Sequence, residues 1–218
     1  QVTSKITCWP ASSRIGVVNR LVTTTPSRWT ARSHSSAVVG SPKVSVAVPL
    51  QDVPSVLVDN LHGVRSAIEH LVTVHHRRNI AFIRGPTVNP EAEERFAVYR
   101  QSLARLGLPY DPELVSAGTL DRGSGGEAIA RLCARSTPFD AVMAANDSMA
   151  LAAIEALHAR GLRVPSDVSV IGFDDIEEAS FQNPPLAAVR QPLEQQAQRG
   201  IELLLARSRD GLAATRIT

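Results

Sequence analysis

From about residue 53 onward, short apolar runs alternate with longer amphipathic segments, and this alternation constrains the fold more than any other feature. Short apolar runs bounded by turn residues are typical of buried strands, which we expect at 55–58, 79–83, 114–117, 141–145 and 168–173. Segments whose apolar residues share one helical face predict helices over 63–75, 91–106, 124–135, 147–160 and 195–207. Because strands that alternate with helices form a parallel sheet with crossover helices, we predict an α/β fold.

Local signals refine the predicted helix that starts near residue 124. Ser124 and Glu127 have the S-x-x-E spacing of a capping box, which predicts the helix start at this point. Gly123, Gly125 and Gly126 lie close together, but neither the G-x-x-x-x-G-K nor the G-x-G-x-x-G spacing of a phosphate-binding loop is present. We therefore interpret these glycines as a flexible loop.

The first quarter of the chain differs sharply from the rest in charge. Residues 1–51 contain six Lys or Arg and neither Asp nor Glu. Such a basic stretch is compatible with a nucleic-acid-binding arm or with a transit-like segment. However, its charges follow no helical face, and Trp9 and Trp29 are not spaced as a stacking platform. We interpret the stretch as an irregular or damaged segment.

Several functional classes find no support in the sequence. No apolar run approaches the roughly 20 residues that span a bilayer, and the start shows no secretory signal pattern. We therefore expect a cytoplasmic protein without a membrane partner. Cys8 and Cys133 are the two cysteines, and we predict that Cys133 is buried and reduced on an apolar helix face. Neither a zinc spacing nor a helix-turn-helix segment is evident, so no metal site and no direct DNA contact are expected.

A set of short motifs points to a family. They are VLVDN at 56–60, HRRNIAFI at 76–83, ER at 94–95, ANDSMA at 145–150, VPSDVSVIGFDDI at 164–176 and VRQP at 189–192. Each motif is weak alone, but their order and spacing extend over most of the chain after residue 53. Together they resemble the lactose-repressor/galactose-repressor (LacI/GalR) family of transcriptional regulators, in the effector-binding domain.

The resemblance implies a periplasmic-binding-protein-like fold, in which two Rossmann-type, three-layer αβα lobes clamp an effector and crossing strands form a hinge. On this chain it implies a C-terminal effector-binding lobe at 53–192 and a return helix toward the N-terminal lobe at 193–218. Residues 1–52 then correspond to an atypical or degenerate remnant of the N-terminal lobe, so that the second lobe is incomplete. The implied hinge residues are Val58, Asp59, Asn60, Val189 and Arg190.

Two candidate effector contacts directly follow predicted strands. Ligands of open α/β sheets bind beyond the carboxyl ends of the strands. Asp174 ends the predicted strand before it and can accept hydrogen bonds from ligand hydroxyls, or it can form a turn with Asp175. Asn146 can both donate to and accept from a ligand, or it can cap the following helix.

Three further candidates rest mainly on the resemblance. Arg95 offers a rigid fork of donors to two ligand oxygens, or it is a solvated partner of Glu91 or Glu94. Gln191 lies at the second implied crossing, where its amide faces the effector or ties the hinge strands together. Leu120 stands where some family members place an aromatic residue that stacks on a sugar ring, so an aliphatic residue there weakens the assignment of a sugar.

The resemblance implies a sensor for a small molecule, a sugar or related metabolite, in a repressor that is a homodimer. Operator DNA would be bound through a helix-turn-helix headpiece that this sequence does not include. No cofactor is expected, and no catalysis, because the Asp174–Asp175 pair lacks an accompanying nucleophile. The alternatives are a periplasmic sugar-binding protein of a transport system, an enzyme on a Rossmann-like fold, and a non-functional remnant.

Overall fold

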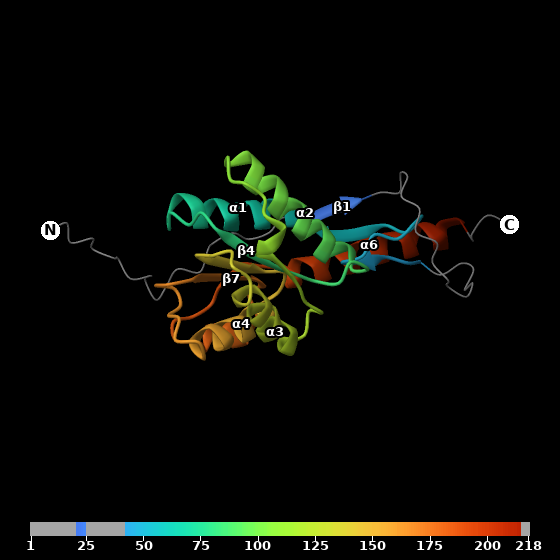
Figure 1. Ribbon diagram of the computed structural model, residues 1–218. Coiled ribbons are helices and arrows are strands. Elements are labelled where there is room, and N and C mark those ends of the chain that lie inside the picture. The colour runs from blue at the N-terminus through green and yellow to red at the C-terminus, as the bar shows by residue number, and fades with distance from the viewer. Residues whose placement is uncertain (1–20, 25–41, 215–218) are drawn as a thin grey trace. The chain divides into compact units, whose positions relative to one another are not determined.

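The computed structural model describes residues 21–24 and 42–214 (Figure 1). Most of the segment predicted to be atypical, 1–52, lies outside the described residues. The chain divides into two compact units, one of which contains residues 63–190. The other contains residues 21–24, 42–62 and 191–214. The chain therefore passes from one unit to the other after residue 62 and again after residue 190.

A parallel sheet of five strands forms the centre of the unit 63–190. In spatial order its strands are β5 (Val115–Ala117), β4 (Ile80–Arg84), β6 (Ala141–Ala144), β7 (Ser169–Asp174) and β8 (Ala187–Arg190). Ile80 pairs with Ala141, which in turn pairs with Ser169, so the central strands run in register. Every residue of β6 is buried, as expected for a central strand covered on both faces. The predicted α/β fold is confirmed.

Helices cover both faces of this sheet. Figure 1 shows α1 (Asn60–Thr73) and α2 (Pro90–Arg105) on one face, and α3 (Arg122–Cys133) and α4 (Asp147–His158) on the other. Two short helical turns, η1 (Pro112–Leu114) and α5 (Glu177–Ser180), lie in the connections. The largest fully buried side chains come from strands and helices alike and include Phe82, Tyr99, Met143, Met149 and Phe173. One continuous apolar core thus holds the three layers together.

Helix α3 differs from its prediction in two respects. Its N-cap is Asp121, whose Oδ1 accepts a hydrogen bond from the Ser124 amide at 3.0 Å, so the predicted capping box is wrong. The flexible-loop interpretation is also wrong, because Gly123, Gly125 and Gly126 all lie inside the helix. At Gly125 the helix crosses α4 so closely that an added Cβ would lie 2.7 Å from the Cα of Met149. The absence of a side chain permits this close approach.

Cys133, the last residue of α3, is exposed and free. The predicted burial is wrong because Ile129 and Leu132 occupy the buried face of the helix. Cys133 is turned by about 100° from Leu132 and lies beyond Ile129, at the exposed edge of that face.

The other unit contains a three-stranded sheet and one long helix. Its central strand β3 (Ser55–Val58) pairs antiparallel with β1 (Leu21–Thr24) and parallel with β2 (Ser45–Val46). Helix α6 (Leu193–Ala214) is longer than predicted and packs on β2 and β3. The side-chain amide of Gln196 is buried there and donates to the carbonyl of Val56 at 3.2 Å. In the described part of the chain, no helix combines the length and the apolar character needed to cross a membrane.

Candidate functional site

The carboxyl edge of the five-stranded sheet brings together two of the predicted effector contacts. Arg95 lies in α2, and its Nη1 is 3.9 Å from Oδ1 of Asp174, the last residue of β7. The same nitrogen donates to the carbonyl of Ala145, directly after β6, at 2.7 Å. The guanidinium also lies 3.8 Å from the ring centroid of Phe173, a distance typical of a cation–π contact. Arg95 therefore links the ends of β6 and β7.

Burial and neighbouring carboxylates act in opposite directions on Arg95. The residue is 4% exposed, and burial lowers the pKa of its guanidinium. Asp174 and Glu91 favour the charged form, and Nη2 donates to Glu91 Oε2 at 3.2 Å. Because the intrinsic pKa of arginine is so high, the side chain stays cationic. Arg95 does pair with Glu91, but it is a buried cation rather than a solvated partner.

Asp174 occupies a strained turn. Its φ is 136° and that of Asp175 is 61°, so two successive non-glycine residues lie at positive φ. The two carboxylates point to different partners, since Asp175 accepts a hydrogen bond from Nε of Arg190 at 2.5 Å. The turn that we considered as an alternative role for Asp174 is present. The Asp174 side chain keeps 25% exposure, and its contact with an effector remains a prediction.

Asn146 uses both ends of its amide within the protein. As the N-cap of α4 it accepts from the Met149 amide at 3.1 Å, which confirms the capping role. Its Nδ2 donates to the carbonyl of Leu120 at 2.8 Å. Leu120 has a φ of 69° and packs partly buried against the core. These two candidates are thus joined to each other, and their contacts with an effector remain predictions.

The remaining candidates are not brought into this cluster. Gln191 directly follows β8 and belongs to the other unit. Of the predicted hinge residues, Val58, Asp59 and Asn60 belong to that unit as well, whereas Val189 and Arg190 end β8. These residues lie within a few positions of the two places where the chain passes between the units. The hinge itself remains a prediction.

Two important residues of this edge escaped the sequence analysis. Asp147 is fully buried, and its Oδ2 accepts from the backbone amide of Ile176 at 2.9 Å. Burial, reinforced by the charge of Asp174, raises its pKa to about 7, against an opposing hydrogen bond from the Ile176 amide. Phe173 lies under Arg95. The sequence signal for Asp147 was its place in the first turn of a helix whose following residues are almost all apolar.

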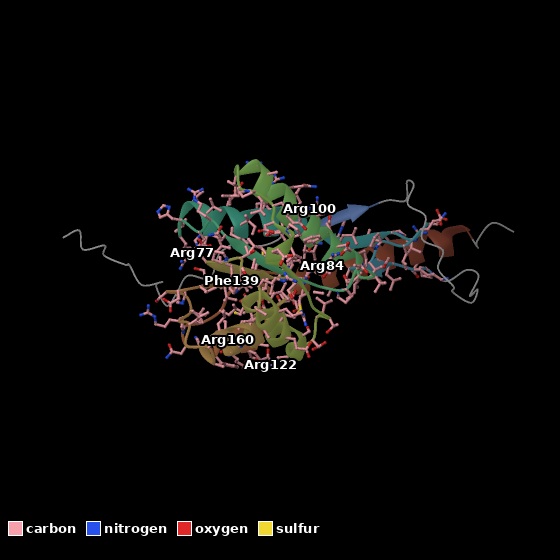
Figure 2. The ribbon with its side chains drawn as sticks, in the orientation of Figure 1. Arg77, Arg84, Arg100, Arg122, Phe139 and Arg160 are labelled. Atoms are coloured by element: carbon pink, nitrogen blue, oxygen red, sulfur yellow. The ribbon has the colours of Figure 1, made fainter. Side chains whose placement is uncertain are left out.

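Opposite edges of the sheet differ in chemistry. Figure 2 labels Arg77, which precedes β4, and Arg84, which ends it and pairs with Glu93. Arg77 fastens the amino edge by donating to Ser169 Oγ at 3.0 Å and to the Pro165 carbonyl at 2.7 Å.

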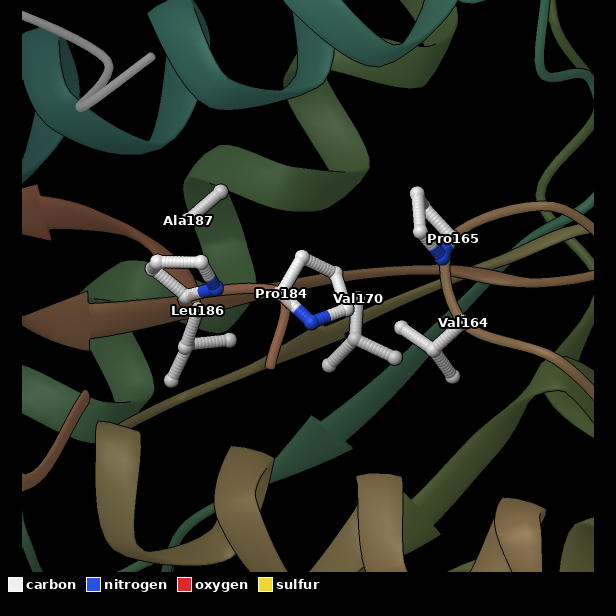
Figure 3. A pocket seen from close by; sticks show the side chains of 7 residues that line it. Val164, Pro165, Val170, Pro184, Leu186 and Ala187 are labelled. Carbon is white, nitrogen blue, oxygen red and sulfur yellow. The ribbon is translucent and has the colours of Figure 1, made fainter. Parts of the chain in front are cut away.

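An apolar pocket also lies on the amino edge, where β7 and β8 begin (Figure 3). Its lining consists of Val164, Pro165, Val170, Pro184, Pro185, Leu186 and Ala187. None of these side chains is polar, so the pocket lacks side-chain donors and acceptors that would orient a hydroxylated ligand. The polar carboxyl edge is therefore the candidate site.

The carboxyl edge has the chemistry of a binding site. It combines a buried guanidinium, carboxylates and an amide, which are groups of the kind that donate to or accept from hydroxyls. No three potential metal-ligating side chains gather anywhere within 21–24 and 42–214. An open parallel sheet with such polar groups at the carboxyl ends of its strands defines an α/β ligand-binding domain.

Comparison with known proteins identifies the family. A model described as a periplasmic binding protein-like domain matches residues 68–217. The chain is 41% identical over 162 residues to the HTH-type transcriptional regulator CelR of Thermobifida fusca, which covers 74% of this chain and 47% of CelR. It thus spans about half the length of the curated relatives it matches. The chain belongs to the periplasmic binding protein-like domain family, and its relatives are regulators of the LacI type.

Solved structures support the same assignment. A sugar-binding transcriptional regulator of the LacI family from Escherichia coli, complexed with phosphate, superposes with a TM-score of 0.72 at 35% identity. The match covers 75% of this chain and 59% of that one. The CelR–cellobiose complex matches with a TM-score of 0.65 over 68% of this chain and 45% of that one. Both the predicted resemblance and the predicted periplasmic-binding-protein-like fold are confirmed.

Proposed function

We propose that this chain is the effector-sensing part of a LacI-type transcriptional repressor, and that its effector is an uncharged sugar. The observation that carries the proposal is the buried Arg95, flanked by Asp174 and Glu91 at the carboxyl edge of the sheet. The cation is neutralised by these carboxylates, so the edge attracts no anion but keeps hydrogen-bonding groups for hydroxyls. Sugar phosphates and sugar acids are therefore disfavoured.

The relatives support a regulatory role over the alternatives. CelR is named a transcriptional regulator, and one of its solved structures is a complex with cellobiose. By analogy we propose that this chain controls operator DNA through a helix-turn-helix segment, as a cytoplasmic homodimer. Neither CelR nor the E. coli regulator supports a transport role. We also propose that the site binds without catalysis, because its Asp and Arg side chains are engaged with one another rather than with a nucleophile.

The two passages between the units suggest how binding is transmitted. We propose that Val58, Asp59 and Asn60, together with Val189 and Arg190, form a hinge about which the units change their arrangement. A ligand shifts such an equilibrium only by its difference in affinity for the two arrangements. We also propose that Gln191, directly after β8, contacts the effector.

Calorimetric titration tests the proposed function. Wild-type protein is titrated with cellobiose, with a panel of other neutral sugars and with the corresponding sugar phosphates. We expect heat of binding for at least one neutral sugar and none for its phosphate.

Replacing Asp174 by Asn tests the site itself. Asp174→Asn removes the negative charge that strengthens hydrogen bonds from ligand hydroxyls to this side chain. We expect at least about tenfold weaker binding of the same sugar, equivalent to ~1.4 kcal/mol. Asp167→Asn serves as the matched control, because Asp167 precedes β7 and pairs with Arg163 at the surface. Flat heats with every neutral sugar would contradict the proposed function, whereas equal weakening in both variants would contradict the site.

A further inference from the structure

The buried carboxylate of Asp147 has two unusual features. One oxygen, Oδ2, accepts from the Ile176 amide at 2.9 Å, and the Asp175 amide also faces the carboxylate. The other oxygen, Oδ1, makes no hydrogen bond among the described residues. A carboxylate that is fully buried with one unsatisfied oxygen carries a desolvation cost, which calls for a specific explanation.

The backbone of β7 is shaped to admit this carboxylate. An added Cβ at Gly172 would collide with Oδ1 of Asp147, so only glycine leaves room for the oxygen at this position. The carboxylate therefore lies directly against the strand, just before the turn that carries Asp174. Both its placement and its hydrogen bonds are directed at one short segment, residues 172–176.

That segment is the strained turn of the candidate site. Asp174 and Asp175 are both held at positive φ, and the following residue, Ile176, is anchored by Asp147. The short helix α5 begins after Ile176 without a side-chain cap of its own. A conformation of this kind persists only when its surroundings hold it in place. Asp147 supplies such a hold from α4, whereas Arg95 approaches Asp174 from α2 on the other face of the sheet (Figure 1).

We propose that Asp147 is a positioning residue for the effector: its ionised carboxylate holds the β7–α5 turn so that Asp174 is presented to the ligand, and protonation loosens that hold. This inference rests on the proposed function. An ionised carboxylate accepts stronger hydrogen bonds from amide N–H groups than the neutral acid does. In the protonated acid, one oxygen carries a hydrogen and becomes a donor. A backbone N–H is also a donor, so it cannot accept a hydrogen bond from this O–H group.

Burial and, to a smaller extent, the charges around Asp147 determine the pH at which the change occurs. Asp174 and Asp175 face it from the turn, and Arg95 faces it from α2. Asp175 is itself paired with Arg190 of β8. Burial, together with the two carboxylates, raises the pKa of Asp147 to about 7, against the lowering effect of the backbone hydrogen bonds. The ionised fraction therefore increases between pH 6 and pH 8, and effector affinity should increase with it.

A ligand-free measurement tests the hold on the turn. In 15N-labelled full-length chain, the amide resonance of Ile176 is followed by NMR from pH 5 to pH 9. We expect a titration with a midpoint near 7, which disappears in Asp147→Asn. Asp140→Asn is the matched control, because Asp140 likewise accepts two backbone amides, those of Arg78 and Asn79, but at the amino edge of the sheet. A wild-type Ile176 resonance that does not move between pH 6 and pH 8 overturns the inference.

Calorimetry with cellobiose tests the consequence for binding. If only the ionised form presents Asp174 correctly, the apparent affinity of the wild type rises by up to about tenfold from pH 6 to pH 8. The rise should be absent in Asp147→Asn and retained in Asp140→Asn. A titrating Ile176 amide with pH-independent cellobiose affinity overturns the positioning role alone. Flat heats with cellobiose and every other neutral sugar instead overturn the proposed function.

Discussion

At the scale of single residues, Arg95 is the group on which the candidate site most depends. Its guanidinium is almost fully buried and holds the Ala145 carbonyl, Glu91 and Asp174. Arg95→Ala would remove the cation that pairs with these acceptors, and water has little access to replace it there. Removal of one partner of a buried ion pair costs about 3–5 kcal/mol, and we expect a loss of unfolding free energy in this range.

Urea unfolding followed by far-UV circular dichroism measures this loss. Arg122→Ala is the matched control, because Arg122 pairs with Glu155 at 2.5 Å while both side chains stay about half exposed. Exposed pairs contribute at most about 1 kcal/mol, so the control should shift the urea midpoint only slightly. Comparable losses in the two variants would mean that Arg95 has no special structural role.

The sequence predicted some residues of the site and missed others for a physical reason. Asp174 and Asn146 were proposed because polar residues directly after parallel strands gather at one sheet edge, and Arg95 was proposed mainly from the resemblance. Asp147 was missed because a carboxylate in the first turn of a helix is normally exposed and favourable there. Only the tertiary contact with Gly172 and Ile176 shows that it is buried.

At the scale of elements, the crossing of α3 and α4 depends on one glycine. An added Cβ at Gly125 would collide with the backbone of Met149, and backbone cannot move aside as a flexible side chain does. At Gly126, one residue further, an added Cβ would meet ordinary contacts at 3.8 and 3.9 Å. We therefore expect Gly125→Ala to destabilise by about 1–3 kcal/mol, as overpacking does.

Gly126→Ala provides the opposite expectation in the same helix. Alanine is favoured over glycine in a helix interior by about 1 kcal/mol, so this variant should be slightly stabilised. Thermal and urea unfolding measure the change in stability of each variant relative to the wild type, which we expect to be a loss for Gly125→Ala and a gain for Gly126→Ala. Stabilisation by both substitutions would show that α3 does not approach α4 as closely as described.

The elements themselves were predicted unevenly. Strand β3 has the predicted ends, because its short apolar run is bounded by turn residues. Helix α3 (Arg122–Cys133) was predicted at 124–135, too far along the chain, and its glycines suggested a loop, since local propensity says nothing about a close helix crossing. Strand β8 was expected only as part of a crossing segment at 189–192, and its actual range, Ala187–Arg190, includes two alanines without strand preference. Its pairing with β7 supplies the missing stabilisation.

At the scale of the whole molecule, a partly buried histidine pair and the buried Asp147 give opposite dependences of stability on pH. The Nε2 atoms of His70 and His75 are 3.0 Å apart, and burial lowers the pKa of both rings, with the charge of His70 further lowering that of His75. Because the folded state binds these protons less readily than the unfolded state, their stabilisation is present above pH 6.5 and lost as the pH falls below it.

Asp147 acts in the opposite sense. Its pKa is raised from 3.8 to about 7 by burial, so the folded state binds this proton more readily than the unfolded state does. Its contribution is therefore greatest below pH 3.8 and is lost as the pH rises to about 7. A pKa difference of this size corresponds to ~4 kcal/mol. Between pH 5 and pH 7 the histidines and Asp147 offset one another in the wild type.

Replacing Asp147 by Asn should separate the two contributions. Asparagine keeps the size of the side chain but has no proton to bind, so the variant retains only the histidine contribution. We expect its urea midpoint to rise from pH 5 to pH 7. Over this range its free energy of unfolding should increase relative to that of the wild type by up to about 1.4 kcal/mol per pH unit. Above about pH 8 the two midpoints should run parallel, because Asp147 is then almost fully ionised in both the folded and the unfolded wild-type chain. A difference in urea midpoint that stays constant from pH 5 to pH 8 would mean that Asp147 binds no proton on folding. It would contradict the conclusion that burial raises the pKa of Asp147.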